Sequence, residues 1–435
     1  MAWVPGIWRI FHQFAIFLLF AAAFGIPVWA FHSGGVGECI GCHSIHGTDI
    51  GQGGTGNDNS ISIALTGSDP GSTCLKCHLA AAEKRPSAYL VATADGDMPP
   101  GVPPAQLSPG GDFGWLKKSY RWGAGGGDGD GNSPGERHGH NIVALGFGFA
   151  QDAGRATAPG GSFPAALLSC ISCHDPHGIY RRLADGSIGK TGIPIQASGS
   201  YNTSPDPSGD RAVGVYRLLG GKGYASSQYD GAPFTEDPPA AVSPENYNRP
   251  EDRGDTRVAY GKGMSEWCSN CHPAQRGGTG GAGKAHPVGN HIKFSSAVAA
   301  NYNAYIASGN LTGNPATSYS SMVPFEMGTA DYALLKGTSA ATGGQTAGPG
   351  ISSNVMCLSC HRAHASGWDH AMRWNTKSEF LVFNGEYPGV EVSGVPARIS
   401  QWRTRAETRK TFGDRPPTAY AAYQRSLCNK CHAKD

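Results

Sequence analysis

The sequence has no cysteine outside one recurring pattern, no long apolar run after its first thirty residues, and few charges. The absence of other cysteines leaves no thiols for a separate disulfide framework. The absence of a long run excludes a membrane-spanning helix in that part of the chain, because a span needs about 20 consecutive apolar residues. Charged residues make up 16% of the 435 residues, and the formal net charge is +2.

The composition also argues against an ordinary apolar core. The chain contains 64 glycines and 30 prolines, which is nearly twice their usual share of about 12%. Such a composition predicts loops and disfavours long helices and strands. A chain of this kind would normally look half disordered, unless another apolar group supplies the core.

All twelve cysteines belong to six copies of Cys-x-x-Cys-His. In each copy, two thiols one helical turn apart are placed to form thioethers with the two vinyl groups of a haem, and the next histidine reaches the iron from the same side. Disulfides, zinc sites and thioredoxin-like pairs do not require a histidine after every pair. The pattern therefore predicts six covalently bound c-type haems, numbered here in chain order.

The motifs assign two sets of residues to these haems. The predicted thioether residues are Cys39, Cys42, Cys74, Cys77, Cys170, Cys173, Cys268, Cys271, Cys357, Cys360, Cys428 and Cys431. The predicted proximal iron ligands are His43, His78, His174, His272, His361 and His432.

Six haems change the expected fold and charge. At roughly one haem per seventy residues, the porphyrins provide apolar surface around which loops can wrap. We expect a multihaem c-type cytochrome that is mostly coil and loops, with short helices around a linear chain of six haems and very little sheet. The best helical windows are Cys74 to Arg85, Ile292 to Ser308 and Thr418 to Ala433. Ionised haem propionates would make the loaded protein negative, which argues against a nucleic-acid partner.

Residues 1–30 have the pattern of a secretory signal peptide. Arg9 precedes an apolar run over 14–24, and residues 28–30 form an A-x-A-like cleavage site. The alternative is an uncleaved membrane anchor, which Gly25 and Pro27 disfavour. Cleavage after residue 30 predicts an exported protein in which residues 31–435 form a single elongated hexahaem domain.

The number of histidines distinguishes an electron carrier from a haem enzyme. Of the sixteen histidines, six are proximal candidates and His12 lies in the leader, which leaves nine candidates for six distal positions. Every iron can therefore have two axial histidines. A catalytic multihaem protein usually keeps one open iron, often at an altered motif, whereas all six motifs here are regular. The sequence predicts outer-sphere electron transfer and no enzyme activity.

Three of the nine candidates follow a proximal histidine by three residues, namely His46, His177 and His364. A histidine one helical turn from the proximal ligand lies on the same side of that haem, so it must ligate a different one. If each extension reaches back two haems, His364 serves haem three and His177 serves haem one. By continuation, His46 reaches haem five of the adjacent protomer. Such a head-to-tail contact propagates into a filament unless it closes a ring.

The other candidates fall into groups within which the residues alone do not choose. They are His32, then His138 or His140, then His286 or His291, with His370 to spare. Methionine ligands are a weaker alternative, because methionine is more often apolar packing and histidine is plentiful here.

Long strings along nearly all of residues 31–435 resemble the filament-forming hexahaem outer-surface cytochromes of metal-reducing bacteria, the OmcS type. The strings are FHSGGVGEC from residue 31, PGGDFGWLKKSY from 109, CHDPHGIYRR from 173, RVAYGKGMSEWCSNCH from 257, CLSCHRAHASG from 357 and YQRSLCNKCHAKD from 423. The sequence departs from the family pattern at 123–131, 276–284 and 383–410.

The resemblance implies a micrometre-scale nanowire of stacked haems, with alternating parallel and T-shaped neighbours, bis-histidine ligation and one axial ligand donated across each protomer boundary. It implies surface positions for His138, His291 and His370. The distal set that it implies is His32, His46, His140, His177, His286 and His364.

The expected function is extracellular electron transfer along this polymer at the outer cell surface, as in dissimilatory metal reduction. Outer-membrane cytochromes would donate electrons, and metal oxides, electrodes or partner cells would accept them. The alternative is a discrete, non-polymeric electron carrier of the periplasm or outer membrane. A multihaem reductase of a small nitrogen or sulfur substrate is a third reading, which would need an open iron.

Overall fold

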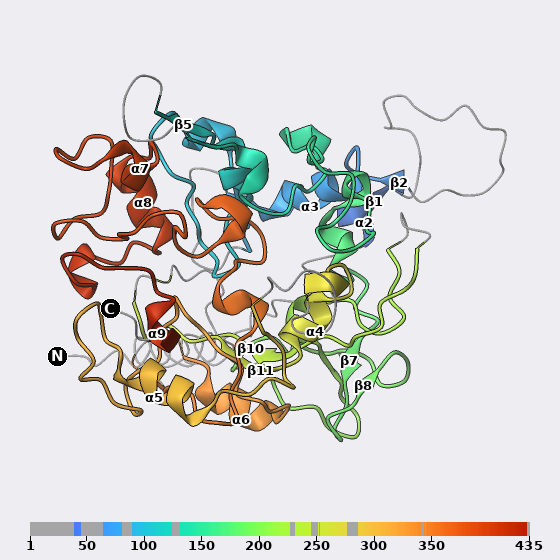
Figure 1. The fold of residues 1–435 in the computed structure, drawn as a ribbon. Helices are drawn as coiled ribbons and strands as arrows, with labels where there is room; N and C mark the ends of the chain where they lie inside the picture. Colours follow the sequence, from blue (N-terminus) through green and yellow to red (C-terminus); the bar gives the residue numbers. More distant parts are fainter. Residues whose placement is uncertain are drawn as a thin grey trace, which may run out of the picture.

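The computed structural model describes residues 39–44, 64–80, 89–123, 131–226, 231–244, 251, 253–275, 286–340, 343 and 345–432. Most of these residues lie in loops, turns and bends (Figure 1). The α-helices are short: α2 (Cys39–Cys42), α3 (Pro70–His78), α4 (Met264–Cys268), α5 (Ser296–Ala304), α6 (Tyr332–Thr338), α7 (Ala397–Ser400), α8 (Arg405–Thr411) and α9 (Asn429–His432). The predicted loop-rich fold with short helices is confirmed.

Single turns of 3₁₀ helix lie between the α-helices. They are η2 (Asp95–Asp97), η3 (Phe113–Lys117), η4 (Gly135–Arg137), η5 (Leu145–Phe147), η6 (Ala165–Leu167), η7 (Cys170–Ser172), η8 (Tyr216–Leu218), η9 (Pro273–Gln275), η10 (Cys357–Ser359), η11 (Asp369–Ala371) and η12 (Pro417–Ala419). None of the helices in the described ranges is both long and apolar enough to cross a membrane.

The strands are also short, two to four residues each. They are β1 (His43–Ser44), β2 (Ala64–Leu65), β3 (Leu79–Ala80), β4 (Ala92–Thr93), β5 (Tyr120–Trp122), β6 (Gly131–Ser133), β7 (Arg181–Arg182), β8 (Ile188–Gly189), β9 (Val213–Gly214), β10 (Ala240–Val242) and β11 (Ala259–Lys262). They pair as β1–β2, β3–β4, β5–β6, β10–β11 and the three-stranded β8-β7-β9; only β3–β4 is parallel. The expectation of very little sheet is confirmed.

The helical windows are only partly correct. Helix α3 begins at Pro70 because the Asp69 carboxylate caps it, accepting from the Ser72 amide at 2.7 Å, and proline at the first position is already in a helical conformation. It ends at His78, where Leu79 turns extended. The window at 292–308 contains α5, whereas 418–433 contains only the end of η12 and the short helix α9, with turns between them.

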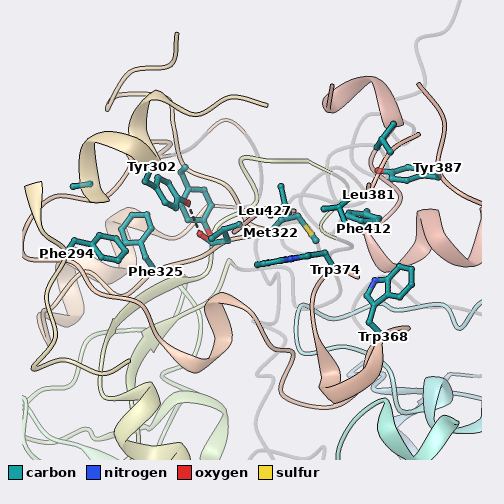
Figure 2. Packing of buried hydrophobic residues seen from close by; sticks show 14 residues of the cluster. Phe294, Tyr302, Met322, Phe325, Trp368, Trp374, Leu381, Tyr387, Phe412 and Leu427 are labelled. Carbon is teal, nitrogen blue, oxygen red and sulfur yellow. Dashed lines mark hydrogen bonds between the residues drawn. The ribbon is translucent and has the colours of Figure 1, made fainter. Parts of the chain in front are cut away.

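Four small apolar clusters occur in the described chain, instead of one continuous core. In the largest, Tyr302 packs edge-on against Phe325 with ring centroids 5.5 Å apart, and its hydroxyl donates to the Val323 carbonyl at 2.7 Å (Figure 2). Cys360 and Cys431 pack against this cluster. A smaller cluster around Leu75, Phe113 and Trp115 contacts Cys170. A third cluster contacts Cys173 and Cys268, so three of the four clusters lie beside Cys-x-x-Cys-His motifs.

Helix α9, which carries the last motif, packs on α5 (Figure 1). The buried Lys430 ammonium donates to the carbonyls of Tyr302 and Tyr305 at 3.2 and 2.8 Å, where α5 ends. Burial lowers the pKa of Lys430 to about 8. These bonds connect the last motif to the largest apolar cluster.

Candidate haem-binding sites

The motifs form single helical turns. In motifs three to six, the histidine amide donates to the carbonyl of the first cysteine at 2.9–3.1 Å. Side chains at positions i, i+3 and i+4 of a helix share one face. Each of these turns therefore presents two sulfurs and one imidazole to the same side, as thioether and iron attachment requires. All twelve cysteines are described, and none is in a disulfide.

The thiols of successive motifs lie near one another. At two of the five junctions between successive motifs, the thiols are directly hydrogen-bonded. A side-chain hydrogen bond with Cys170 lowers the pKa of Cys74, and one with Cys268 lowers the pKa of Cys357. At the other three junctions, burial raises a thiol pKa and the next motif raises it further; the pairs are Cys42 with Cys74, Cys173 with Cys271 and Cys360 with Cys428. The six motifs thus follow one another in space in chain order, with direct contacts at alternate junctions.

Four proximal histidines each face one predicted distal histidine. The ring centroids are separated by 6.2 Å for His43 and His177, 6.5 Å for His174 and His364, 6.0 Å for His272 and His140, and 6.1 Å for His432 and His286. A metal bonded to the facing nitrogen of each imidazole at about 2 Å places the two ring centroids about 6 Å apart. All four separations fit an iron between the rings.

Backbone carbonyls orient six of the candidate ligand imidazoles. The Nδ1 atoms lie 2.6–3.0 Å from a carbonyl oxygen in His78, His140, His174, His272, His286 and His361. Because a carbonyl can only accept, Nδ1 carries the proton and Nε2 keeps its lone pair. This tautomer is the one that binds iron through Nε2, and the hydrogen bond also fixes the ring direction.

Burial keeps three of the candidate ligands, His140, His361 and His364, neutral. It lowers the pKa of His364 to about 3, with His174 adding repulsion, and the pKa of His140 to about 4, with His272 adding repulsion. Burial also lowers the pKa of His361. A neutral imidazole has the lone pair that a metal needs.

His140 and His364 are neighbours across a β-bridge between Gly139 and Ala365. The His140 amide donates to the His364 carbonyl at 3.0 Å, and the His140 Nδ1 donates to the Ala363 carbonyl at 2.7 Å. A Cβ at residue 139 would lie 2.2 Å from the His364 oxygen, so this approach requires glycine. The bridge holds the candidate ligands of haems three and four together.

Motifs three and five are held by the same three hydrogen bonds, which we call the three-bond clasp. At motif three they run from His174 Nδ1 to Arg217 O (2.7 Å), from Asp175 N to Leu218 O (2.7 Å) and from Gly220 N to Cys173 O (2.9 Å). At motif five they run from His361 Nδ1 to His370 O, from Arg362 N to Ala371 O and from Arg373 N to Cys360 O, all at 2.7 Å.

The carbonyls of the clasp come from left-handed residues. Arg217 and Leu218 have φ values of 54° and 53°, and His370 and Ala371 have 62° and 53°. Non-glycine residues rarely adopt this conformation. Sequence reasoning missed these four positions, because it has no signal for left-handed backbone where no glycine or asparagine stands.

The three histidines predicted at the surface have different environments. His291 and His370 are exposed, as predicted. The prediction for His138 is wrong, because its ring is fully buried. Its Nδ1 donates to the Trp115 carbonyl at 2.8 Å and its Nε2 lies 2.8 Å from the Ser133 hydroxyl, so both nitrogens are engaged inside the protein.

Some predicted features lie outside the described residues. They include the candidate ligands His32 and His46, the signal peptide over 1–30, and most of the departures at 123–131 and 276–284. The third departure, 383–410, is described and forms α7 and most of α8.

Comparison with known proteins gives a close match. No protein-family model matches the chain. The C-type cytochrome OmcS of Geobacter sulfurreducens is 48% identical over 413 residues, which cover 94% of this chain and 95% of that protein. The chain belongs to the OmcS family of c-type cytochromes. Two solved structures, an Outer Membrane Cytochrome S filament and OmcS nanowires, both from Geobacter sulfurreducens, share 47% and 46% identity with TM-scores of 0.82 and 0.83; each comparison covers 93% of this chain and 100% of the other.

Membership of the OmcS family confirms the resemblance expected from the strings above. It establishes an OmcS-like cytochrome fold and covalently bound haem for this chain. The helical turns of the motifs and the four histidine pairs agree with that cofactor.

Proposed function

We propose that this chain conducts electrons through six c-type haems inside a head-to-tail filament. The proposal rests mainly on the four facing histidine pairs at 6.0–6.5 Å, each of which joins the proximal histidine of one motif to a histidine from a distant part of the chain. When bound, each haem supplies an iron that gains and loses one electron. The chain's own residues attach the groups in a row and orient their axial imidazoles, and burial keeps His140, His361 and His364 neutral.

The proposed axial pairs follow from the contacts. His43 with His177 serves haem one, His174 with His364 haem three, His272 with His140 haem four, and His432 with His286 haem six. Two H-x-x-H histidines, His177 and His364, thus face the proximal histidine two motifs earlier. This supports the rule that each such histidine ligates the haem two positions back in the chain. Continued to the start of the chain, the same rule assigns His46 to haem five of the adjacent protomer, and His32 is left for haem two.

The proposed location is outside the cell. The leader at 1–30 would export the protein, and residues 31–435 would form one hexahaem domain that polymerises at the outer cell surface. Two similar solved structures are a filament and nanowires, which supports polymerisation. Outer-membrane cytochromes would supply electrons, and metal oxides, electrodes or partner cells would receive them.

The test is His46→Ala in the secreted, haem-loaded protein. We expect six haems by intact mass and no filaments in electron micrographs. One of the six haems should become high-spin in the absorption spectrum, because its second axial ligand is gone. His291→Ala, at an exposed histidine outside the four pairs, is the matched control and should form normal filaments. Normal filaments from the His46 variant would refute the trans-protomer ligand, and discrete wild-type particles would favour a non-polymeric carrier.

A further inference from the structure

Motifs three and five share the three-bond clasp but differ in charge. The residue after the proximal histidine is Asp175 in motif three and Arg362 in motif five. The residue whose amide donates to the second cysteine is Gly220 in one motif and Arg373 in the other. The same backbone frame therefore presents a carboxylate at one site and two guanidinium groups at the other.

The arginines of motif five are fully buried around one carboxylate. The side chains of Arg362 and Arg373 are 1% exposed, and their Nη1 atoms lie 2.8 and 3.2 Å from Glu251 carboxylate oxygens. Arg415 is also buried and donates to the carbonyls of Phe412 and Arg253. Burial alone would raise the pKa of Glu251, but the three arginines together lower it. Among the described residues, three cations therefore surround one anion, an excess of two positive charges.

This excess lies directly against the proximal ligand of motif five. Arg373 Nε donates to the Leu358 carbonyl at 2.8 Å and to the His361 carbonyl at 3.2 Å. Arg362 is bonded to His361 through the backbone. A guanidinium stays protonated inside proteins, so the charge is permanent.

The residues of the clasp at motif three carry no such excess. The Asp175 carboxylate is buried and accepts from the amides of His177 and Ile179 at 3.1 and 2.5 Å. The cationic residue of this clasp is Arg217, whose side chain is only partly buried; it donates to the Tyr201 and Ser243 hydroxyls and lies over the Tyr216 ring. The clasp at motif three therefore contributes one anionic and one cationic residue.

We propose that haem five has a higher midpoint potential than haem three, because the buried arginines of motif five favour the reduced haem and Asp175 disfavours it at motif three. Reduction adds one negative charge, and charges buried in a low dielectric are weakly screened by solvent or salt. The inference rests on the proposed function, in that His361 and His174 must hold haems. It adds that the haems differ in midpoint potential along the chain, so that an electron has a lower free energy at haem five than at haem three.

The experiment is a potentiometric titration of the haem-loaded protein, followed by absorbance. In Arg362→Gln, one-sixth of the absorbance change should move to lower potential, and in Asp175→Asn one-sixth should move to higher potential. Arg362→Lys keeps the charge and loses the planar hydrogen-bonding geometry, so its titration should match the wild type. Opposite shifts from the two neutralising variants cannot come from a general loosening of the structure.

A second variant covers the case in which Arg362→Gln does not fold. Glu251→Gln removes the only carboxylate paired with these arginines among the described residues, and it should move one-sixth of the titration to higher potential. Unchanged titrations, or shifts of the same sign in Arg362→Gln and Asp175→Asn, would overturn the inference. Intact mass and the low-spin spectrum are recorded alongside, because a haem count other than six would count against the proposed function instead.

Discussion

His138 and His140 stand two residues apart, and their ring nitrogens have different partners. Both nitrogens of His138 are used within the protein, by the Trp115 carbonyl and the Ser133 hydroxyl. His140 uses only Nδ1, and its ring faces His272 at 6.0 Å. Only His140 has a nitrogen left for iron, which is why we assign it to haem four.

This assignment makes opposite predictions for the two alanine variants. His140→Ala should give one high-spin haem, because haem four loses an axial ligand. His138→Ala should keep six low-spin haems but lose about 1–3 kcal/mol of unfolding free energy, because buried hydrogen-bonding groups lose their partner. Absorption spectra and denaturant unfolding measure both effects. A high-spin signal in the His138 variant would show that the wrong histidine was chosen.

At the scale of elements, Glu326 connects the helix of motif four to the approach to motif five. One carboxylate oxygen accepts from the Met264 amide, at the start of α4, at 2.7 Å. The other accepts from the Asn354 side chain, three residues before motif five, at 2.6 Å. The residue is completely buried, and burial raises its pKa to about 7 despite these hydrogen bonds.

The raised pKa predicts a pH-dependent stability. The folded protein holds a proton on Glu326 that the unfolded chain releases near pH 4.5. This stabilisation is complete below pH 4.5 and disappears as the pH rises through about 7, with a slope of about 1.4 kcal/mol per pH unit. Between pH 5 and 8, unfolding free energy should therefore fall by about 2–3 kcal/mol in the wild type.

Glu326→Gln should remove this part of the pH dependence, because the amide does not titrate. Denaturant unfolding at pH 5 and pH 8 compares the two proteins. The half-exposed Glu379→Gln serves as a control and should keep the wild-type difference. An equal fall in the Glu326 variant would show that another group is responsible.

At the scale of the whole molecule, the described chain holds its motifs with loops, short ladders and four small apolar clusters. Neighbouring sites share structure: the Gly139–Ala365 bridge carries both His140 and His364. Loss of one haem should therefore change the structure and the spectrum of the neighbouring haem site.

Removing one attachment site tests this coupling. In Cys170→Ala/Cys173→Ala, we expect five haems by intact mass and a lower thermal midpoint, because haem three no longer supplies apolar surface to the chain. Spectral change beyond the loss of one haem is expected, since His364 and His140 share the bridge. A variant that melts like the wild type and loses only one-sixth of its spectrum would contradict the coupling.

Structural features set by neighbouring residues were predictable from the sequence, whereas those set by residues far apart in the chain were less so. Helix α5 lies within a predicted window, whereas α3 begins at Pro70 through the Asp69 cap, ahead of its window. The burial of His138 was not predictable, because its partners Trp115 and Ser133 meet it only in the folded chain. The His291 and His370 predictions were correct, because both residues are exposed.

The sequence by itself determined the covalent chemistry of this protein. Thioether attachment and a proximal histidine need a fixed local spacing, so six motifs and a set of distal candidates are visible in one dimension. Only the tertiary structure decided which imidazoles face each other, which carbonyls orient them and how much charge surrounds each motif. These features depend on contacts between segments up to hundreds of residues apart, such as His140 with Ala363 or Arg362 with Glu251. Such contacts cannot be predicted from the spacing of residues within a motif.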